Sequence, residues 1–523
     1  MASTLKEKPA ALDSATAADE SHASSAEVVI NASGHVQELE RNFGLLSIIG
    51  VAVVTGNTWA ALAGTITVAI YNGGAPGVIF EFIVVSVMYW FIGASIAELS
   101  SAVPSAGGVY HWASLTPAPR YQRICGWFAG WWNFLGWVFG VASLSSVLGN
   151  QLVSMYGLFR PEFVPQKWNA FVAYIIMTWL CCFFVLLGNK ALPMSNIVGM
   201  ALSLAGVFIS IMVCAIMPSQ TGAGYASSDF VWSDYENETG ISSPGFVFLA
   251  GMLNGAFAVG TTDSVTHMAE EIPNPGRNIP KAIFFQCAIG FFTTLCFLIA
   301  LFYSVTDLDE IYASVLPFPL AEFYRQATGS AGGALGLLIV IFLPCVSCTI
   351  ACYLTSGRIY WAMARDEATP FSNIFGKINH TWHNPFNSTV LVGVLSTILG
   401  CIQVGSTTAF NAFVGSAVVL LTASYVAAIL PHLMTRRSRL VPVSHSIQSF
   451  GRVELTIHPP GCAYIIVFIV IFCYPYSMPV TAQNMNYSSV LIGGSTIFIG
   501  IWYVIRGRRG YRGPQVLASM AST

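Results

Sequence analysis

Three titratable side chains in a strongly apolar stretch are the residues best placed to do chemistry. Asp263, His267 and Glu270 are spaced i, i+4 and i+7, and on an α-helix this spacing puts them on one face. A carboxylate and an imidazole in contact can hold and pass a proton, because histidine titrates near neutral pH. We therefore predict that Asp263 or His267 transfers a proton. The alternative, hydrogen bonding between packed helices, stays open at this point.

The elements that carry these residues must be membrane-spanning helices. The chain has 523 residues, of which 55% are hydrophobic and only 9% are charged, against roughly 25% charged in soluble domains. About 20 apolar helical residues cross a hydrocarbon core of about 30 Å. Such runs recur along the chain and predict an all-α membrane protein of about twelve transmembrane helices near residues 45–70, 76–99, 124–150, 166–188, 193–217, 244–268, 281–305, 331–357, 387–404, 409–433, 461–480 and 486–505.

The basic residues predict which ends of these helices face the cytoplasm. Of 22 lysines and arginines, only Arg160, Lys167 and Arg325 fall in the segments predicted to lie outside. Positive charge collects on the cytoplasmic side of membrane proteins, so we expect both termini there, in a multi-pass protein of the plasma membrane. Residues 1–40 and 506–523 would then be cytoplasmic tails, the first of them disordered, on either side of a transporter domain at 41–505.

Several other classes of protein are disfavoured. The basic residues are scattered and the net charge is −2, which excludes a nucleic-acid partner. The twelve cysteines lie in apolar runs without paired spacing, so we expect no disulfide, no metal site and no cofactor. No catalytic motif is present, and the protein is predicted not to be an enzyme. Asn237 and Asn486 fit the short pattern of a glycan acceptor.

Two predicted spans, the first and the sixth, carry interruptions near mid-helix. The interruption in the first span reads TGNTW at 55–59, and that in the sixth span reads NGAFAVGTTD at 254–263. An unwound membrane helix exposes backbone groups, which is tolerated where they line a cavity. The two spans hold matching positions in two five-helix halves, 45–217 and 244–433, with helices at 461–505 left over. This pattern predicts a 5+5 inverted-repeat transporter with discontinuous helices 1 and 6 and a site between the repeats.

Five longer motifs resemble the amino acid–polyamine–organocation superfamily, and within it the fungal amino acid/choline permeases. The motifs read NFGLLS at 42–47, TGNTW at 55–59, ASIAELSSAVPSAGGVY at 94–110, HMAEEIPNP at 267–275 and SGRIYWAMARD at 356–366. The resemblance as a whole covers about residues 40–505. The resemblance implies a LeuT-like fold and uptake of choline, GABA, an amino acid or a polyamine, driven by an ion gradient. A transporter of a secondary-metabolite alkaloid or its precursor is an alternative, and a transport-inactive nutrient sensor is disfavoured.

The resemblance also implies where the substrate binds. Thr55, Gly56 and Asn57 would offer backbone groups to its polar head, aided by the positive end of a half-helix. In the sixth span Phe257 would be an aromatic gate, within an unwound stretch from Ala256 to Gly260.

A quaternary ammonium group is held by aromatic faces, and Trp59 beside the first break is our candidate for this contact. Trp137 in the third span is also available, although packing is the more common role for a tryptophan there.

The coupling ion stays open between sodium and a proton. Ser347 and Thr349 in the eighth span match the place where sodium-coupled relatives carry hydroxyl ligands. Some proton-coupled relatives instead use a lysine in the fifth span, and no lysine occurs between Pro193 and Pro218. The fungal resemblance favours a proton.

Overall fold

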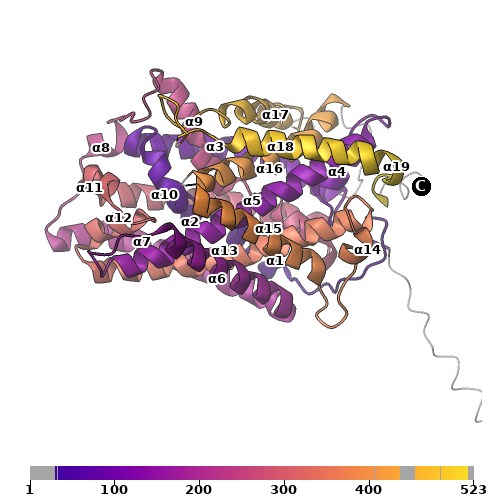
Figure 1. Ribbon diagram of the computed structural model, residues 1–523, viewed down its shortest axis with the longest axis horizontal. Helices are drawn as coiled ribbons and strands as arrows, with labels where there is room; N and C mark the ends of the chain where they lie inside the picture. Colours follow the sequence, from indigo (N-terminus) through magenta and orange to yellow (C-terminus); the bar gives the residue numbers. More distant parts are fainter. Residues whose placement is uncertain (1–29, 32, 407, 436–453, 483, 516–523) are drawn as a thin grey trace, which may run out of the picture.

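The computed structural model describes residues 30–515 except 32, 407, 436–453 and 483. Most of the predicted cytoplasmic tails therefore lies outside the described residues. Within them the chain folds into a bundle of long helices that run along one axis (Figure 1). Seven unbroken helices before residue 409 are long and apolar enough to cross a membrane: α3 (Gly74–Ala102), α5 (Gln122–Gly157), α6 (Lys167–Leu187), α7 (Leu192–Thr221), α10 (Pro275–Tyr303), α13 (Ala331–Arg365) and α15 (Phe386–Gly405).

Four further spans complete the eleven that meet this criterion in the described part of the chain. They are α16 (Ala409–Met434), α18 (Ser488–Trp502) continued by a π-helical turn η4 (Tyr503–Gly507), and two broken spans, α1 (Leu45–Gly56) with α2 (Thr58–Ile70) and α9 (Pro244–Val259) with the 3₁₀ helix η2 (Ser264–Glu271). An all-α membrane fold with discontinuous first and sixth spans is thus confirmed. The breaks occupy the same position in each half, as the repeat pattern predicts.

The expected span at 461–480 is wrong in its position. The helix there, α17, runs over Glu454–Ile471, and its apolar part His458–Ile471 is shorter than the other spans. No helix continues past Ile471, because Asn486 binds the carbonyls of Phe472 and Tyr474 and folds the following segment into a loop. Hydropathy alone could not detect this.

Short helices in the connections were not predicted. They are α4 (Val109–Leu115), η1 (Asn189–Ala191), α8 (Ser228–Trp232), α11 (Leu308–Ala313), α12 (Leu320–Thr328), α14 (Ser372–Phe375) and α19 (Arg508–Gly510). In Figure 1, α8 and α11 lie at the left end of the bundle, whereas α14, α19 and the end of the chain lie at the right. The charge pattern predicts that this right-hand end faces the cytoplasm.

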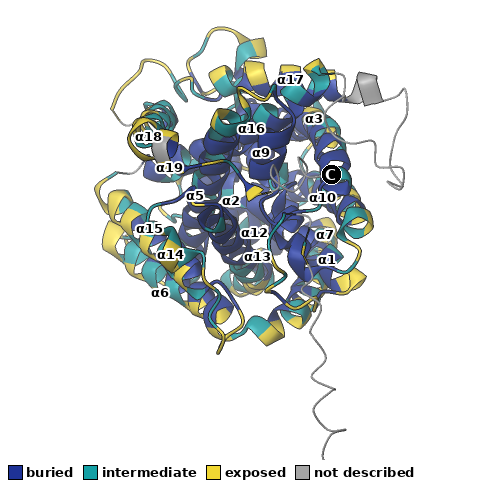
Figure 2. Cartoon of the chain, turned by 90° about the vertical axis from the view of Figure 1, so that its right-hand side faces the viewer, coloured by how far each residue is buried: buried dark blue, intermediate teal, exposed yellow. Residues whose placement is uncertain are grey.

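Burial separates central helices from peripheral ones. In a view along the bundle, buried residues fill the middle around α2, α5 and α9, and exposed residues lie on α6, α15 and α18 (Figure 2). The most apolar window of α5 is 78% buried, against 11% for α18. Helix α5 packs against α16 and α13, so its polar side chains face protein rather than lipid. A polar site is therefore expected at the centre of the bundle, where its side chains avoid the free-energy cost of contact with lipid.

Asp366, which follows α13, joins distant parts of the chain at the right-hand end. His35 Nε2 lies 2.9 Å from Asp366 Oδ1, His111 Nε2 lies 2.9 Å from Oδ2, and the backbone N–H of Gln515 donates to Oδ1. Burial by itself raises the pKa of Asp366, but the hydrogen bonds from His111 and His35 outweigh it and hold the pKa well below its usual range. The carboxylate thus ties both ends of the described chain to the bundle.

We expect Asp366→Asn to destabilise the protein by about 3 kcal/mol at pH 7, because a buried charge pair is broken. A carboxyl with a lowered folded-state pKa gives stability that is present above its unfolded pKa of about 3.9 and lost as pH falls through the folded value. The full difference in the free energy of unfolding between wild type and variant should therefore be present at pH 7. Thermal unfolding in detergent measures it, with the exposed neighbour Glu367→Gln as control. Equal melting temperatures for all three chains would contradict it.

Candidate functional site

The first span breaks at Asn57, which separates α1 from α2. Its backbone is left-handed, with φ 32° and ψ 46°, a conformation that asparagine tolerates better than most side chains. The N–H of Asn57 donates to the Val53 carbonyl in the last turn of α1. The Asn57 carbonyl accepts from the N–H groups of Ala60 and Ala61 in the first turn of α2. The break therefore reorients the chain at a single residue and costs few hydrogen bonds.

The side chain of Asn57 is held by a short hydrogen-bond chain. Trp59 Nε1 donates to Ser203 Oγ at 3.1 Å, and Ser203 Oγ donates to Asn57 Oδ1 at 2.9 Å. The Trp59 ring packs edge-on against Phe297, with 5.3 Å between the ring centroids. Trp59 is thus turned toward α7 and α10 and does not line the cavity between the breaks. The expectation that Trp59 contacts a cation is at odds with this geometry, which gives it a packing role.

Substitutions at Asn57 should separate its backbone role from its side-chain role. Asn57→Gly keeps the left-handed backbone accessible, whereas Asn57→Val places a β-branched side chain in a strained conformation that costs about 1–2 kcal/mol. We expect Asn57→Val to lose more transport and more thermal stability than Asn57→Gly. Uptake and melting temperature measured on both variants test this, and the reverse order would contradict it.

The second break begins later than predicted. Helix α9 continues to Val259, so Ala256–Val259 is helical and the irregular stretch covers Gly260 to Asp263. Tyr425 Oη of α16 lies 3.0 Å from the Gly260 carbonyl, a group that the end of α9 leaves free, and shares its one proton between that carbonyl and Asp263 Oδ1. The sequence could not reveal this, because the tyrosine that supports the break lies in another helix.

The break also means that Asp263, His267 and Glu270 do not share one helix face as predicted. Residues after it form the 3₁₀ helix η2, with about three residues per turn instead of 3.6. Asp263 and His267 still meet, with His267 Nε2 3.1 Å from Asp263 Oδ2. Glu270 instead pairs with Arg365 at the end of α13, and Glu271 pairs with Arg358 at 2.7 Å. The idea of three titratable groups on one face is therefore wrong for Glu270.

Asp263 is fully buried and receives hydrogen bonds from side chains of α5 and α16. Asn133 Nδ2 of α5 donates to Oδ2 at 2.7 Å and Tyr425 Oη donates to Oδ1 at 2.7 Å, while Trp137 Nε1 lies 3.5 Å from Oδ2. Together with His267 Nε2, three nitrogens lie within hydrogen-bond distance of Oδ2, which fits an ionised carboxylate because it only accepts. Sequence reasoning missed Asn133 and Tyr425, for which the sequence gives no distinct signal.

The two ring nitrogens of His267 both face acceptors. Nε2 faces the Asp263 carboxylate, and Nδ1 lies 3.1 Å from the carbonyl oxygen of Ala106. A neutral imidazole carries one N–H and so can serve one of these acceptors, whereas the imidazolium serves both. The geometry thus favours a charged Asp263–His267 pair, which can hold a proton at membrane depth.

A small cavity lies between the two breaks. It has a volume of about 30 Å³, which holds a few water molecules, so a solute can enter only if the surrounding helices move. Four of the predicted substrate residues line it, Thr55, Gly56, Phe257 and Gly260, whereas Asn57 does not. No charged side chain is among the lining residues. The remainder are Ala61, Gly136, Trp137, Gly140, Leu144, Thr261, Cys348, Cys352, Ala417, Val418 and Leu421.

The proposed sodium ligands do not face this cavity. The hydroxyls of Ser347 and Thr349 donate to the carbonyls of Leu343 and Cys345 in their own helix. Between them, the thiol of Cys348 donates to the carbonyl of Thr55 at the first break, with a distance of 3.4 Å. A thiol is a poor ligand for a hard cation such as Na⁺, so this geometry gives the sodium alternative no support.

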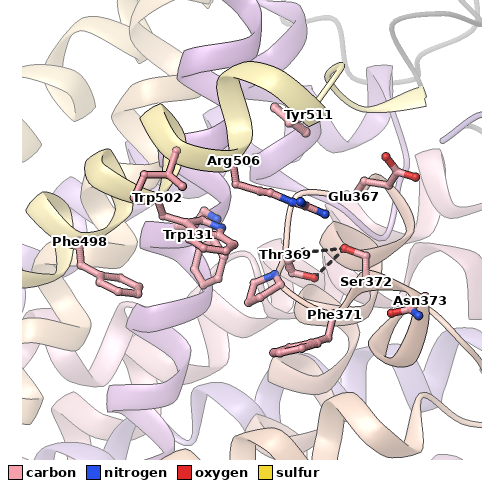
Figure 3. A pocket seen from close by; sticks show the side chains of 13 residues that line it. Trp131, Glu367, Thr369, Phe371, Ser372, Asn373, Phe498, Trp502, Arg506 and Tyr511 are labelled. Carbon is pink, nitrogen blue, oxygen red and sulfur yellow. Dashed lines mark hydrogen bonds between the residues drawn. The ribbon is translucent and has the colours of Figure 1, made fainter.

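A larger cavity of about 960 Å³ lies at the right-hand end of the bundle, away from both breaks. Figure 3 shows Trp131, Trp502 and Phe371 around it, with the Arg506 side chain extending across it from η4. Because α18 and η4 form the bundle periphery, this cavity opens at the protein surface. It does not include any predicted substrate residue.

Neither predicted glycan acceptor is freely exposed. Asn486 is buried, and both of its amide hydrogens serve backbone carbonyls, which argues against a glycan there. Asn237 is partly exposed in a loop that is predicted to lie outside, but its Nδ2 donates to Ile241 and its Oδ1 accepts from Thr239. A glycan at Asn237 stays a prediction.

A bundle of membrane-length helices, with two buried helix breaks meeting at a central cavity, defines the class of secondary transporters. Comparison with known proteins identifies the family. The amino acid permease family model matches residues 44–496. The chain therefore belongs to the amino acid permease family, within the amino acid–polyamine–organocation superfamily, and is a permease and not an enzyme.

Relatives and solved structures agree with this assignment. The chain is 31% identical to a choline transporter of Saccharomyces cerevisiae over 92% of its own length and 84% of that protein. It is 28% identical to a putative amino acid/polyamine transporter of Macrophomina phaseolina, over 84% and 96% of the two chains. A manganese transporter of Eremococcus coleocola shares the fold, with a TM-score of 0.54 at 15% identity, over 92% of this chain and 98% of that one.

Proposed function

We propose that this permease takes up a small organic cation, with choline as the first candidate, across the plasma membrane and in symport with protons. The observation that carries the proposal is the composition of the central cavity. Its aromatic members are Trp137 and Phe257, it holds no basic side chain, and the Trp137 indole lies against the buried carboxylate of Asp263. Ring faces and a nearby negative charge suit a quaternary ammonium group, which cannot donate hydrogen bonds.

The Asp263–His267 pair supports the proposal of proton symport. Asp263 contacts helices α5 and α16 and lies at the second break, so a change in its protonation would alter contacts between the broken helix and its neighbours. Thr261 connects the second break to the first, because its hydroxyl lies 3.5 Å from the Thr55 carbonyl. Gln286 holds Thr261 in place by donating to both its carbonyl and its hydroxyl. Proton binding and substrate binding can thus act on the same pair of breaks.

A second candidate is the transport of an alkaloid or of its amino-acid precursor. It is favoured by the likeness to the 7-keto 8-aminopelargonic acid transporter of Saccharomyces cerevisiae, a relative named for an amino-acid metabolite, which is 24% identical over 87% of this chain and 90% of that protein. GABA, other amino acids and polyamines remain substrates to be compared directly with choline. A zwitterion would need a partner for its carboxylate, and the cavity offers only backbone N–H groups and hydroxyls for this.

Uptake of radiolabelled choline, GABA, an amino-acid panel and a polyamine into permease-deficient yeast tests the proposal. We expect saturable choline uptake that increases at acidic pH and is lost with a proton uncoupler. Phe257→Leu should raise KM by up to about 30-fold, since a desolvated cation–π contact is worth about 2 kcal/mol. Phe284→Leu, on the exposed surface of α10, is the control. Uptake of GABA but not choline would overturn the cation preference.

A further inference from the structure

Two histidines and a glutamate from three helices meet near the predicted cytoplasmic ends of those helices. Glu98 lies near the end of α3, His432 near the end of α16, and His458 in α17. His432 Nε2 is 3.3 Å from Glu98 Oε1, and His458 Nε2 is 3.0 Å from Oε2. All three residues are buried, and one ligand atom from each lies within 4.8 Å of the others. This cluster is separate from the Asp263 site, and the transport mechanism proposed above does not use it.

The hydrogen bonds around His458 suit a ring that carries a proton on Nδ1. Ser95 Oγ lies 2.9 Å from the Phe91 carbonyl and 2.7 Å from His458 Nδ1. When the one hydroxyl proton is given to the carbonyl, Nδ1–H is the donor to Ser95 Oγ. In a neutral ring the lone pair of Nε2 then points at the Glu98 carboxylate. Two electron-rich atoms 3.0 Å apart need a cation between them, either a second ring proton or a metal ion.

The donor set and its spacing fit a divalent transition metal. Zn²⁺ binds imidazole nitrogen and carboxylate oxygen at about 2.0–2.2 Å, which separates tetrahedral ligand atoms by about 3.3 Å. Two histidine–glutamate separations, 3.3 Å to Oε1 and 3.0 Å to Oε2, lie close to this value, and the three ligand atoms lie within 4.8 Å of one another. Ser95 supplies the outer hydrogen bond that orients a ligating histidine in metal sites.

We propose that Glu98, His432 and His458 form a binding site for a divalent metal ion of the zinc type. His432 and His458 would bind through Nε2 and Glu98 through its carboxylate, with no need for large side-chain movement. Because the ligands come from α3, α16 and α17, a bound ion would tether α3 to two consecutive helices that lie far from it in sequence. The site would therefore stabilise their packing at this end of the bundle.

Zinc binding to the purified, chelator-treated full chain tests the proposal, measured by competition with a chromogenic chelator. We expect one tightly bound Zn²⁺ per chain, at least about 10-fold weaker binding in His432→Gln and in His458→Gln, and about 10-fold weaker binding in Ser95→Ala. The double variant His380→Gln/His383→Gln, in an exposed loop, should bind like wild type. No tight site in the wild-type chain, or tight binding that survives both cluster variants, would overturn the proposal.

A measurement on the unaltered chain keeps the test valid where a variant fails to fold. Zinc K-edge X-ray absorption of the loaded protein should show nitrogen and oxygen neighbours at about 2.0–2.1 Å with imidazole scattering. Sulfur neighbours at about 2.3 Å would assign the metal to cysteines instead and would refute the cluster as its site.

Discussion

Asp263→Asn is expected to reduce concentrative choline uptake at least about 100-fold. The substitution keeps the size of the side chain but removes the charge that Asn133, Tyr425 and His267 bind. Removing one partner of a buried, hydrogen-bonded charge pair costs about 2–5 kcal/mol, and about 2.7 kcal/mol corresponds to a factor of 100. The same change leaves the imidazolium of His267 without a counter-charge.

Two assays on this variant separate proton coupling from cation binding. If Asp263 only couples protons, choline exchange across preloaded vesicles should persist while uphill uptake is lost. If Asp263 also attracts the cation, exchange should fall as well. Asp309→Asn, on the exposed outer helix α11, is the matched control for removing an acidic charge. Wild-type uptake by Asp263→Asn, with wild-type dependence on pH, would contradict the role assigned to this carboxylate.

Gly140→Leu is expected to block transport while the fold is kept. Gly140 lines the central cavity, and a Cβ built on it meets no atom within 4 Å. At neighbouring Gly136 a Cβ would instead lie 2.8 Å from Leu421 Cγ, so a substitution there would disturb α5 against α16. A leucine at 140 suits a helix and takes space that the substrate needs. We expect choline uptake to fall at least about 10-fold, and uptake of larger amines to fall further.

The control for this prediction is Gly336→Leu in α13, where a Cβ also meets no atom within 4 Å and which lies on the exposed surface outside the cavity. Both variants should keep the wild-type melting temperature and surface expression, and only Gly140→Leu should lose transport. Equal uptake by the two variants would mean that the substrate does not pass between Trp137, Phe257 and Leu421.

The sequence by itself determined the class of this protein, its helices and its family. Apolar runs separated by short polar breaks give membrane helices, because a lipid-facing backbone must satisfy its hydrogen bonds within the helix. The glycine-containing interruptions at Gly56 and Gly260 marked both breaks, and the motif strings named the family. Thr55, Gly56 and Gly260, which the family resemblance implied as substrate contacts, line the cavity between these breaks.

Only the tertiary structure decided which side chains meet. The α1–α2 and α9–η2 breaks lie near partners from α5, α10, α13 and α16, and Asn133, Gln286 and Tyr425 read in the sequence as ordinary polar residues within apolar helices. The sequence favoured Trp59 over Trp137 for the cation contact, yet Trp59 packs on α7 and Trp137 lines the cavity. The Glu98, His432 and His458 cluster combines residues too far apart for any spacing rule. Spacing along one helix predicts contacts within that helix, whereas contacts between helices depend on packing, which the sequence pattern does not record.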